Sequence, residues 1–152
     1  MDFSIINYID CTEKQIRDIF EMRNREELRR WASDQHVIGY EEHVRFVESL
    51  RHNPDKLYYA VFLEGKLIGS YNLHNTSDGV WERGLFASPE YQGKGLTSQW
   101  EEKILESLPP KRFEIIEAEV KVDNDRSIGY HHKMGFKETG RDKDYVYFEK
   151  SL

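Results

Sequence analysis

The sequence predicts a mixed α/β fold. Short apolar runs rich in β-branched and aromatic residues alternate along the chain with segments whose apolar residues recur at helical spacing. Tight turns join two pairs of these runs, as in hairpins. The chain has 152 residues and no repeats, linkers or low-complexity segments, so we expect one domain over 1–152.

The first part of the chain should form one strand and two helices. Residues 3–9 are β-rich and alternate loosely. Thr12 and Gln15 have the spacing of a capping box, and apolar residues then recur at helical spacing, so a helix is expected over about 13–25. A second helix is expected near 40–50, where two valines and a leucine share one face.

Three strands should follow. The apolar runs 57–63 and 67–73 are joined by 64–66, which contains a glycine and indicates a hairpin. Residues 76–79 are polar and end in glycine, which favours a turn before a third strand over 80–87.

The last third of the chain begins with a long helix near 95–108, which Pro109 and Pro110 end. The remaining expected elements are a strand over 113–120, a short helix over 126–134, and a closing hairpin of 137–141 and 144–150.

Composition narrows the function classes. The formal net charge of −6 argues against a nucleic-acid partner, which usually meets a basic face. Apolar runs of four or five residues are too short to span a membrane, and the N-terminus lacks the pattern of a signal peptide. One cysteine fits a reducing cytoplasm, so we expect a cytoplasmic protein. Cys11 has no histidine nearby in sequence and is interpreted as structural.

A loop between a strand and a helix is a candidate anion site. After Ser-Pro-Glu-Tyr it reads Gln92-Gly93-Lys94-Gly95-Leu96-Thr97. Its two glycines allow a ligand to approach the backbone closely, the start of the helix offers free N–H groups, and Lys94 adds positive charge. The glycines alone would also fit a plain turn.

The loop resembles the Q/R-x-x-G-x-G/A loop of GNAT acetyltransferases, which wraps the pyrophosphate of coenzyme A. Gln92 and Gly95 match, whereas Thr97 stands where Gly or Ala is usual. A second and more specific match is the segment 122–136, which resembles the family pattern N-x-x-[AS]-I-x-x-[YH]-x-K-x-G-F. The resemblance is strong over about 80–148.

This resemblance implies the GNAT fold, a central and mostly antiparallel sheet flanked by helices, with acetyl-CoA as cosubstrate. It further implies that Asn124 binds the pantetheine arm. The full set of implied cofactor-binding residues is Phe86, Ala87, Gln92, Gly93, Lys94, Gly95, Leu96, Thr97, Asn124, Ser127 and Lys133.

The family's proton donor to the departing thiolate is usually a tyrosine seven residues after the asparagine. In this chain that position is His131, and Tyr130 precedes it where leucine is usual. A phenol is protonated at pH 7, whereas a histidine would have to be charged or donate its neutral N–H. The register favours His131, Tyr130 is the alternative, and a mechanism that uses neither stays open.

The incoming amine must lose a proton, and strand carboxylates are the candidate bases. They are Glu82, Glu117 and Glu119, of which the last two should share a face opposite the apolar one. We favour Glu119 because it lies nearest the Asn124 end. No metal site is expected, because adjacent helical histidines point about 100° apart and have no further partner in the sequence.

The acceptor site should come from the N-terminal third. Its Arg-Asn, Arg-Arg-Trp and Glu-Glu-His-Val-Arg-Phe-Val-Glu-Ser-Leu segments resemble a narrower group, the N-acetyltransferases of pseudaminic acid biosynthesis. These acetylate the 4-amino group of a UDP-linked 4-amino-4,6-dideoxy sugar. The resemblance implies that Arg23 and His43 face the nucleotide-sugar, and Trp31 could stack on uracil or be a core residue.

Three functions follow from these observations. The favoured one is a sugar-nucleotide N-acetyltransferase with a small-molecule substrate, and homo-oligomers are possible. The second is an acetyltransferase that acts on protein N-termini or polyamines. The third is a non-catalytic acetyl-CoA-binding module, suggested by Thr97 and the missing tyrosine.

Overall fold

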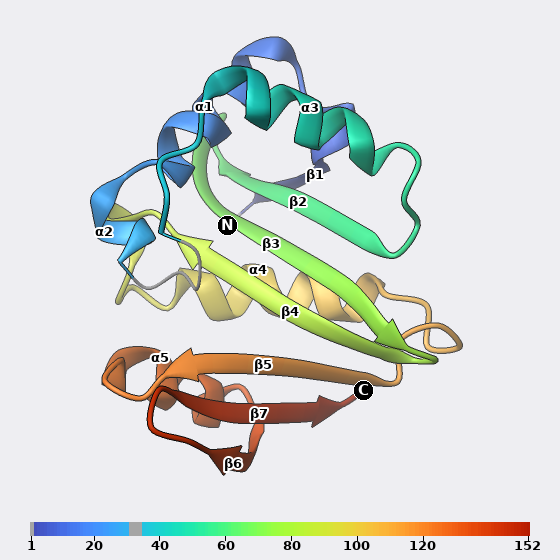
Figure 1. Cartoon of the computed structure of the whole chain (residues 1–152), viewed down its shortest axis with the longest axis vertical. Coiled ribbons are helices and arrows are strands. Elements are labelled where there is room, and N and C mark those ends of the chain that lie inside the picture. The colour runs from blue at the N-terminus through green and yellow to red at the C-terminus, as the bar shows by residue number, and fades with distance from the viewer. Residues whose placement is uncertain (1, 31–34) are drawn as a thin grey trace.

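The computed structural model describes residues 2–30 and 35–152. In this part of the chain, seven strands form a sheet in the order β1-β2-β3-β4-β5-β7-β6 (Figure 1). The strands are β1 (Phe3–Asn7), β2 (Lys56–Leu63), β3 (Lys66–Ser77), β4 (Val80–Ala87), β5 (Ile115–Lys121), β6 (Lys137–Arg141) and β7 (Tyr145–Ser151). Neighbours are antiparallel except β4 and β5, which are parallel. The sheet is thus mixed and mostly antiparallel, as expected.

Five α-helices and two short 3₁₀ turns are described. They are η1 (Tyr8–Asp10), α1 (Glu13–Arg23), α2 (Glu26–Arg29), α3 (Tyr40–Leu50), η2 (Pro89–Tyr91), α4 (Leu96–Ser107) and α5 (Asp125–Lys133). The capping box at the start of α1 is present, with both reciprocal hydrogen bonds between Thr12 and Gln15. None of the described helices is long and apolar enough to cross a membrane.

The two faces of the sheet carry different helices. The buried hydrophobic residues form two clusters, and neighbouring residues of β2 belong to different ones. Ala60 packs with apolar residues of α1 and α3, whereas Val61 packs with those of α4. Because successive strand residues point to opposite faces, α1 and α3 cover one face, and α4 and α5 cover the other.

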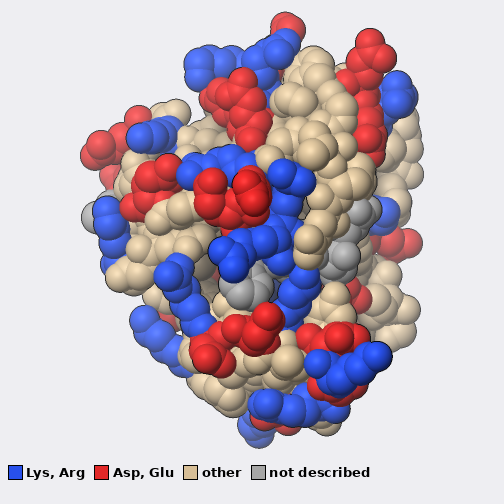
Figure 2. Space-filling view, turned by 60° about the vertical axis from the view of Figure 1, so that its left-hand side comes forward, with Lys and Arg blue, Asp and Glu red and all other residues tan. Residues whose placement is uncertain are grey.

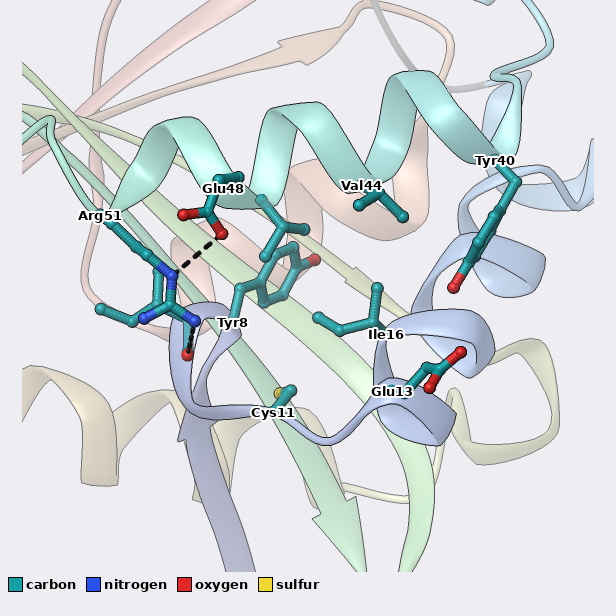
Figure 3. Close-up of a pocket in the computed structure, with 10 residues that line it drawn as sticks. Tyr8, Cys11, Glu13, Ile16, Tyr40, Val44, Glu48 and Arg51 are labelled. Atoms are coloured by element: carbon teal, nitrogen blue, oxygen red, sulfur yellow. Dashed lines mark hydrogen bonds and ion pairs between the residues drawn. The ribbon is translucent and has the colours of Figure 1, made fainter.

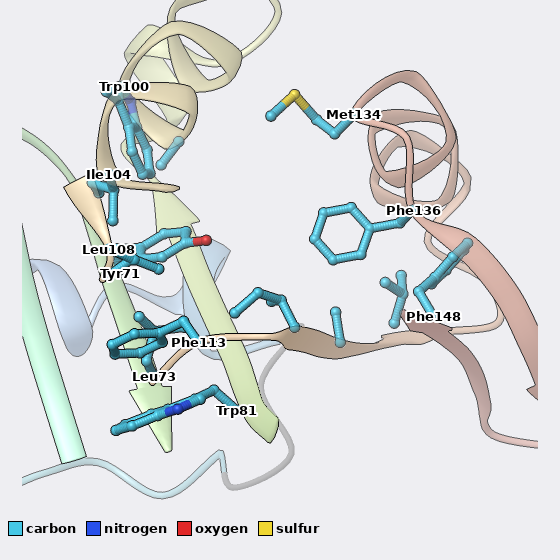
Figure 4. Packing of buried hydrophobic residues seen from close by; sticks show 14 of the residues in the cluster. Tyr71, Leu73, Trp81, Trp100, Ile104, Leu108, Phe113, Met134, Phe136 and Phe148 are labelled. Carbon is cyan, nitrogen blue, oxygen red and sulfur yellow. The ribbon is translucent and has the colours of Figure 1, made fainter. Parts of the chain in front are cut away.

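The larger core lies between the sheet and α4 (Figure 4). Trp81 stacks on Phe113 with ring centroids 4.3 Å apart, and Tyr71 meets Trp100 edge-on at 6.1 Å. Each such buried aromatic contributes roughly 1.5–3 kcal/mol. Gly69 is required here, since a Cβ would lie 2.8 Å from Cζ2 of Trp100. The packing therefore fixes α4 against the middle of the sheet.

One sequence expectation was wrong. Residues 76 and 77 extend β3 rather than beginning a turn, because Ser77 still pairs with Val80 of β4 across an irregularity in register after Asn75. Residues 26–29, for which no element was predicted, form the one-turn helix α2. Other boundaries agree within about two residues, which is within the usual fraying of element ends.

Candidate active site

The site is organised by a gap between the two parallel strands. β4 pairs with β5 only over Val80–Glu82, opposite Ile115–Glu117. Beyond these residues the strands separate, and Figure 1 shows them diverging towards the side where α2 and α5 lie. Residues 83–87 of β4 therefore have no strand partner on this side. Their N–H and C=O groups can pair with an extended ligand that itself carries amides, as an added strand would.

The glycine loop lies at the end of β4 and leads into α4. Gly93 and Gly95 have φ values of 73° and 74°, which favour glycine, and a Cβ on either would meet nothing within 4 Å. Gly95 is the N-cap of α4 and offers no side-chain hydrogen bond to the first turn. The first N–H groups of α4 thus lack a cap, and the space before them is open, which suits a diphosphate.

Contacts from α2 and α5 hold this loop. Arg25, just before α2, pairs with Glu90 at 3.0 Å. Gln92 donates to the carbonyl of Ala87 at 2.8 Å and accepts from Arg126 of α5. Figure 2 shows Lys and Arg side chains gathered on this side of the molecule, with Asp and Glu among them. The loop is therefore fixed from both sides of the gap and has cations nearby.

A buried ion pair lies where the two strands begin to separate. Arg83 is the first residue of β4 beyond the pairing with β5, and it points to the face covered by α4. Its Nε donates to Glu101 of α4 at 2.8 Å, and the side chains are 3% and 0% exposed. Tyr71 and Tyr130 also donate to this carboxylate, at 2.5 and 2.8 Å. The carboxylate is thus held by donors from β3, β4 and α5.

His131 is buried in the same network. Arg83 donates from Nη1 to its Nε2 at 2.8 Å, so the ring proton lies on Nδ1, which donates to the carbonyl of Ser127 at 2.7 Å. Burial, followed by the charge of Arg83, lowers the pKa of His131 to about 3. His131 is therefore a neutral imidazole at pH 7, with both nitrogens in hydrogen bonds.

Tyr130 differs from His131 in exposure and in chemistry. It is half-buried, and its hydroxyl donates to Glu101. Burial, followed by the charge of Glu101, raises the pKa of Tyr130 far above the ordinary value. Its hydroxyl keeps its proton at every working pH.

The other residues assigned to the cofactor lie around the gap. Asn124 caps α5, its Oδ1 accepting from the N–H of Ser127 at 3.3 Å. Leu96 is buried and Thr97 half-buried in the first turn of α4, whereas Lys94 and Lys133 are exposed. Phe86 turns to the opposite face and packs near α1. The structure thus brings Asn124 and Ser127 beside the α5 end of the gap and places Phe86 on the face of β4 that packs near α1.

The candidate bases lie on the face opposite α4. Glu82, Glu117 and Glu119 are all exposed, while their strand neighbours Ile116, Ala118 and Val120 are buried. Glu82 stands directly opposite Glu117, and Glu117 directly opposite Glu149 of β7. This acidic row borders the closed end of the gap, on the face of the sheet opposite α4.

Arg23, the last residue of α1, is hydrogen-bonded to His43 of α3. Nη1 of Arg23 donates to Nδ1 of His43 at 3.0 Å, and Nε2 of His43 donates to the carbonyl of Ile16 at 3.1 Å. Burial, followed by the charge of Arg23, lowers the pKa of His43 to about 4. Arg23 also lies 5.2 Å above the ring of Phe46. The third predicted acceptor residue, Trp31, lies outside the described residues.

A groove elsewhere on the surface contains no predicted site residue. It measures about 360 Å³ and lies between η1, α1 and α3, where Arg51 bonds Glu48 (Figure 3). Cys11 lines it, and burial raises the pKa of this thiol to about 11, which keeps it protonated. Within residues 2–30 and 35–152, no three His, Cys, Asp or Glu side chains are placed to hold a metal ion.

The sequence analysis missed Arg83 and Glu101. A signal was present: Arg83 occupies an inward position of a strand whose other inward residues are apolar, and Glu101 follows Trp100 on the apolar side of a helix. Two opposite charges at core positions of neighbouring elements indicate a buried pair, because an isolated buried charge is too costly.

Comparisons with known proteins agree with this architecture. Residues 18–136 match the sequence model of the acetyltransferase (GNAT) family. The chain is 28% identical over 146 residues to the acetyltransferase PseH of Campylobacter jejuni serotype O:2, covering 93% of this chain and 88% of that protein.

Two solved structures share the fold. The crystal structure of C. jejuni N-acetyltransferase PseH in complex with acetyl coenzyme A has a TM-score of 0.77 and 23% identity, with 99% of each chain covered. Spermidine N-acetyltransferase from Vibrio cholerae, in complex with CoA and spermine, has a TM-score of 0.84 and 19% identity, with 98% of this chain and 95% of that chain covered. This chain belongs to the GNAT acetyltransferase family and is an acetyl-CoA-dependent N-acetyltransferase.

Proposed function

We propose that the enzyme acetylates the 4-amino group of a UDP-linked amino-dideoxy sugar of the pseudaminic acid type. The observation that carries this proposal is the state of Arg23. Its guanidinium is half-buried and hydrogen-bonded to a neutral imidazole, and it forms no ion pair with a carboxylate of the described residues. Glu42 is the acidic group that the charge of Arg23 reaches, but no described carboxylate is paired with the guanidinium, and such a cation suits a diphosphate. Similarity to PseH over most of the chain supports the same acceptor class.

The cosubstrate would bind along the gap between β4 and β5. The N–H groups at the start of α4 would hold its diphosphate, with Lys94 and Arg126 as the nearest cations. The open edge of β4 would pair with the amides of the pantetheine arm, near Asn124. Bound there, acetyl-CoA supplies a thioester to be attacked by the amine. Glu119 or Glu82 would take the amine proton, directly or through a water.

For the proton donor, the hydrogen bonds favour Tyr130 over His131, although the register favoured His131. Tyr130 is half-buried, and release of its hydroxyl leaves Glu101 with Arg83 and Tyr71 as donors. His131 is buried, and Arg83 occupies its Nε2. We assign the proton to Tyr130, which would pass it to the departing thiolate and at once regain a proton, the equivalent of the one that the amine loses, through solvent. His131 is treated as a positioning residue.

The test is a thiol-release assay with UDP-4-amino sugars, spermidine and N-terminal peptides as acceptors. Turnover should be confined to the sugar nucleotides, UDP should compete with them, and Arg23→Ala should raise the acceptor KM at least tenfold without changing the KM of acetyl-CoA. Tyr130→Phe should lower kcat more than His131→Asn does. Turnover of spermidine alone would refute the acceptor assignment.

A polyamine acceptor is the second candidate. One observation favours it: Glu82, Glu117 and Glu149 stand in a cross-strand row on the acceptor side. Like charges placed directly opposite one another in a sheet are destabilising unless a cation lies near them. Lys137 of β6 stands opposite Glu149, so Glu82 and Glu117 are the two carboxylates that an acceptor's ammonium groups would neutralise. The acceptor screen separates this candidate from the sugar nucleotide, because spermidine carries no group that would gain from Arg23.

A further inference from the structure

We propose that Arg83 and Glu101 are positioning residues for acetyl transfer, acting through the hydroxyl of Tyr130 and the ring of His131. Neither residue belongs to the family patterns identified in the sequence. The inference rests on the proposed location of the reaction at the end of the gap between β4 and β5, where Arg83 is the first residue without a β5 partner.

The guanidinium of Arg83 bonds two residues from different helices. Its Nε and Nη2 donate to the two carboxylate oxygens of Glu101 at 2.8 and 3.2 Å, while Nη1 donates to Nε2 of His131 at 2.8 Å. The planar fork therefore holds a residue of α4 and a residue of α5 at once. An ammonium group could not satisfy both partners in this geometry.

The guanidinium of Arg83 also determines which tautomer His131 adopts. Because arginine only donates, Nε2 of His131 must be the bare nitrogen and Nδ1 the protonated one. The ring is held between Arg83 from β4, His132 on its own helix, and the rings of Phe136 and Phe148, the last at 5.0 Å. Arg83 thus fixes the tautomer, and together with the Ser127 carbonyl and the two phenyl rings it fixes the orientation of the imidazole.

Helix α4 lies along both the diphosphate end and the thiol end of the proposed cosubstrate site. Glu101 lies five residues after Leu96, on the same helix whose N-terminus faces the glycine loop. Its Oε1 receives the hydroxyl of Tyr130. One helix, α4, therefore carries both the N–H groups that would bind the diphosphate and the Glu101 carboxylate that orients the hydroxyl of Tyr130. The buried pair sets the distance between α4 and α5 where the thiol end must fit.

Four variants separate positioning from folding: Arg83→Lys, Arg83→Met, Glu101→Gln and the double variant Arg83→Met/Glu101→Gln. Removing one partner of a buried pair is strongly destabilising, whereas replacing both is often close to neutral. The double variant should therefore recover much of the urea midpoint that Arg83→Met loses. The kcat of the double variant and that of Arg83→Lys should both be on the order of 10- to 100-fold below wild type. The KM for acetyl-CoA should stay within about threefold of wild type in both, because the lost interaction acts in the transition state.

A second readout does not depend on turnover. In ¹⁵N-labelled wild-type protein, the imidazole of His131 should show a single neutral tautomer with the proton on Nδ1 between pH 5.5 and 8. In the double variant it should titrate in this range or mix tautomers. A double variant with wild-type kcat and an unchanged His131 spectrum would overturn the proposal. If wild type fails to use sugar nucleotides, the acceptor assignment falls, but kcat with any accepted amine and the spectrum still test the positioning.

Discussion

Replacing Gly95 by aspartate should weaken acetyl-CoA binding roughly 30- to 150-fold without unfolding the protein. Gly95 has a φ of 74° and caps α4, and a Cβ there meets no atom within 4 Å. Aspartate tolerates this backbone region, and its charge favours a helix N-terminus by about 0.3–1 kcal/mol. The free energy of unfolding of the ligand-free variant should therefore stay within about 1 kcal/mol of wild type.

The loss of binding can be estimated from Coulomb's law. A carboxylate about 5 Å from one phosphate charge costs about 3 kcal/mol at an effective dielectric constant of about 20, and solvent screening lowers this towards 2. The dissociation constant should rise roughly 30- to 150-fold, since 1.4 kcal/mol is a factor of ten. At a concentration 100 times the wild-type Kd, acetyl-CoA stabilises wild type by about 2.7 kcal/mol but a 100-fold weaker binder by only about 0.4.

Thermal unfolding with and without acetyl-CoA measures both effects. Wild type should shift by roughly 5–11 °C and the aspartate variant by roughly 1–2 °C. Gly95→Ala is the matched control. Alanine in the left-handed region costs about 1–2 kcal/mol, so this variant should melt lower without ligand yet keep the ligand-induced shift. An aspartate variant with the full wild-type shift would show that the diphosphate binds elsewhere.

Three further predictions concern stability and reactivity. Because His43 and His131 resist protonation down to pH values near 4 and 3, the unfolded chain binds more protons below about pH 6.5. Stability in urea should thus be full above that pH and fall below it by up to about 1.4 kcal/mol per pH unit for each histidine; a flat profile from pH 7.5 to 5 would contradict this. Gly69→Ala should cost about 1–3 kcal/mol in urea unfolding, because the new Cβ would lie 2.8 Å from Trp100, while Gly140→Ala, with open space around it, should cost almost nothing. At pH 8, DTNB should label Cys11 on the order of 100-fold more slowly in folded than in urea-unfolded protein, since its folded pKa is about 11; equal rates would show the thiol to be accessible and ionised.

The elements that could be predicted from the sequence are those with clear local signals. The range of β4, 80–87, and that of α3, 40–50, agree with prediction because periodic apolar residues are bounded by glycine or proline. β3 was predicted too short because the polar residues 76–79 are typical of a turn, whereas pairing with β4 outweighs the weak strand propensity at 76 and 77. Tertiary pairing, not local preference, decides such segments.

The site was only partly predictable for the same reason. The glycine loop and the segment 122–136 carry local patterns, so a loop between a strand and a helix and a short helix could be predicted there. The pairing of Arg83 with Glu101 joins a strand to a helix 18 residues away, and local spacing does not report it. Whether His131 is charged or neutral likewise depends on that distant arginine. Side-chain identity gives the possible roles, and long-range contacts select among them.

The short pairing between β4 and β5 has a mechanical consequence for the whole sheet. β3 and β4 remain paired from Gly69 to Ser77, but only three residue pairs join β4 to β5. Backbone hydrogen bonds therefore join the segment from β5 to the C-terminus to the rest of the sheet over a short stretch, and beside it this segment is held by the larger core and by the contacts of Arg83 with Glu101 and His131. A cosubstrate seated in the gap adds a second connection. Local opening of residues 115–152, measurable as amide hydrogen exchange, should accordingly slow when acetyl-CoA is bound, so the substrate completes the sheet that binds it.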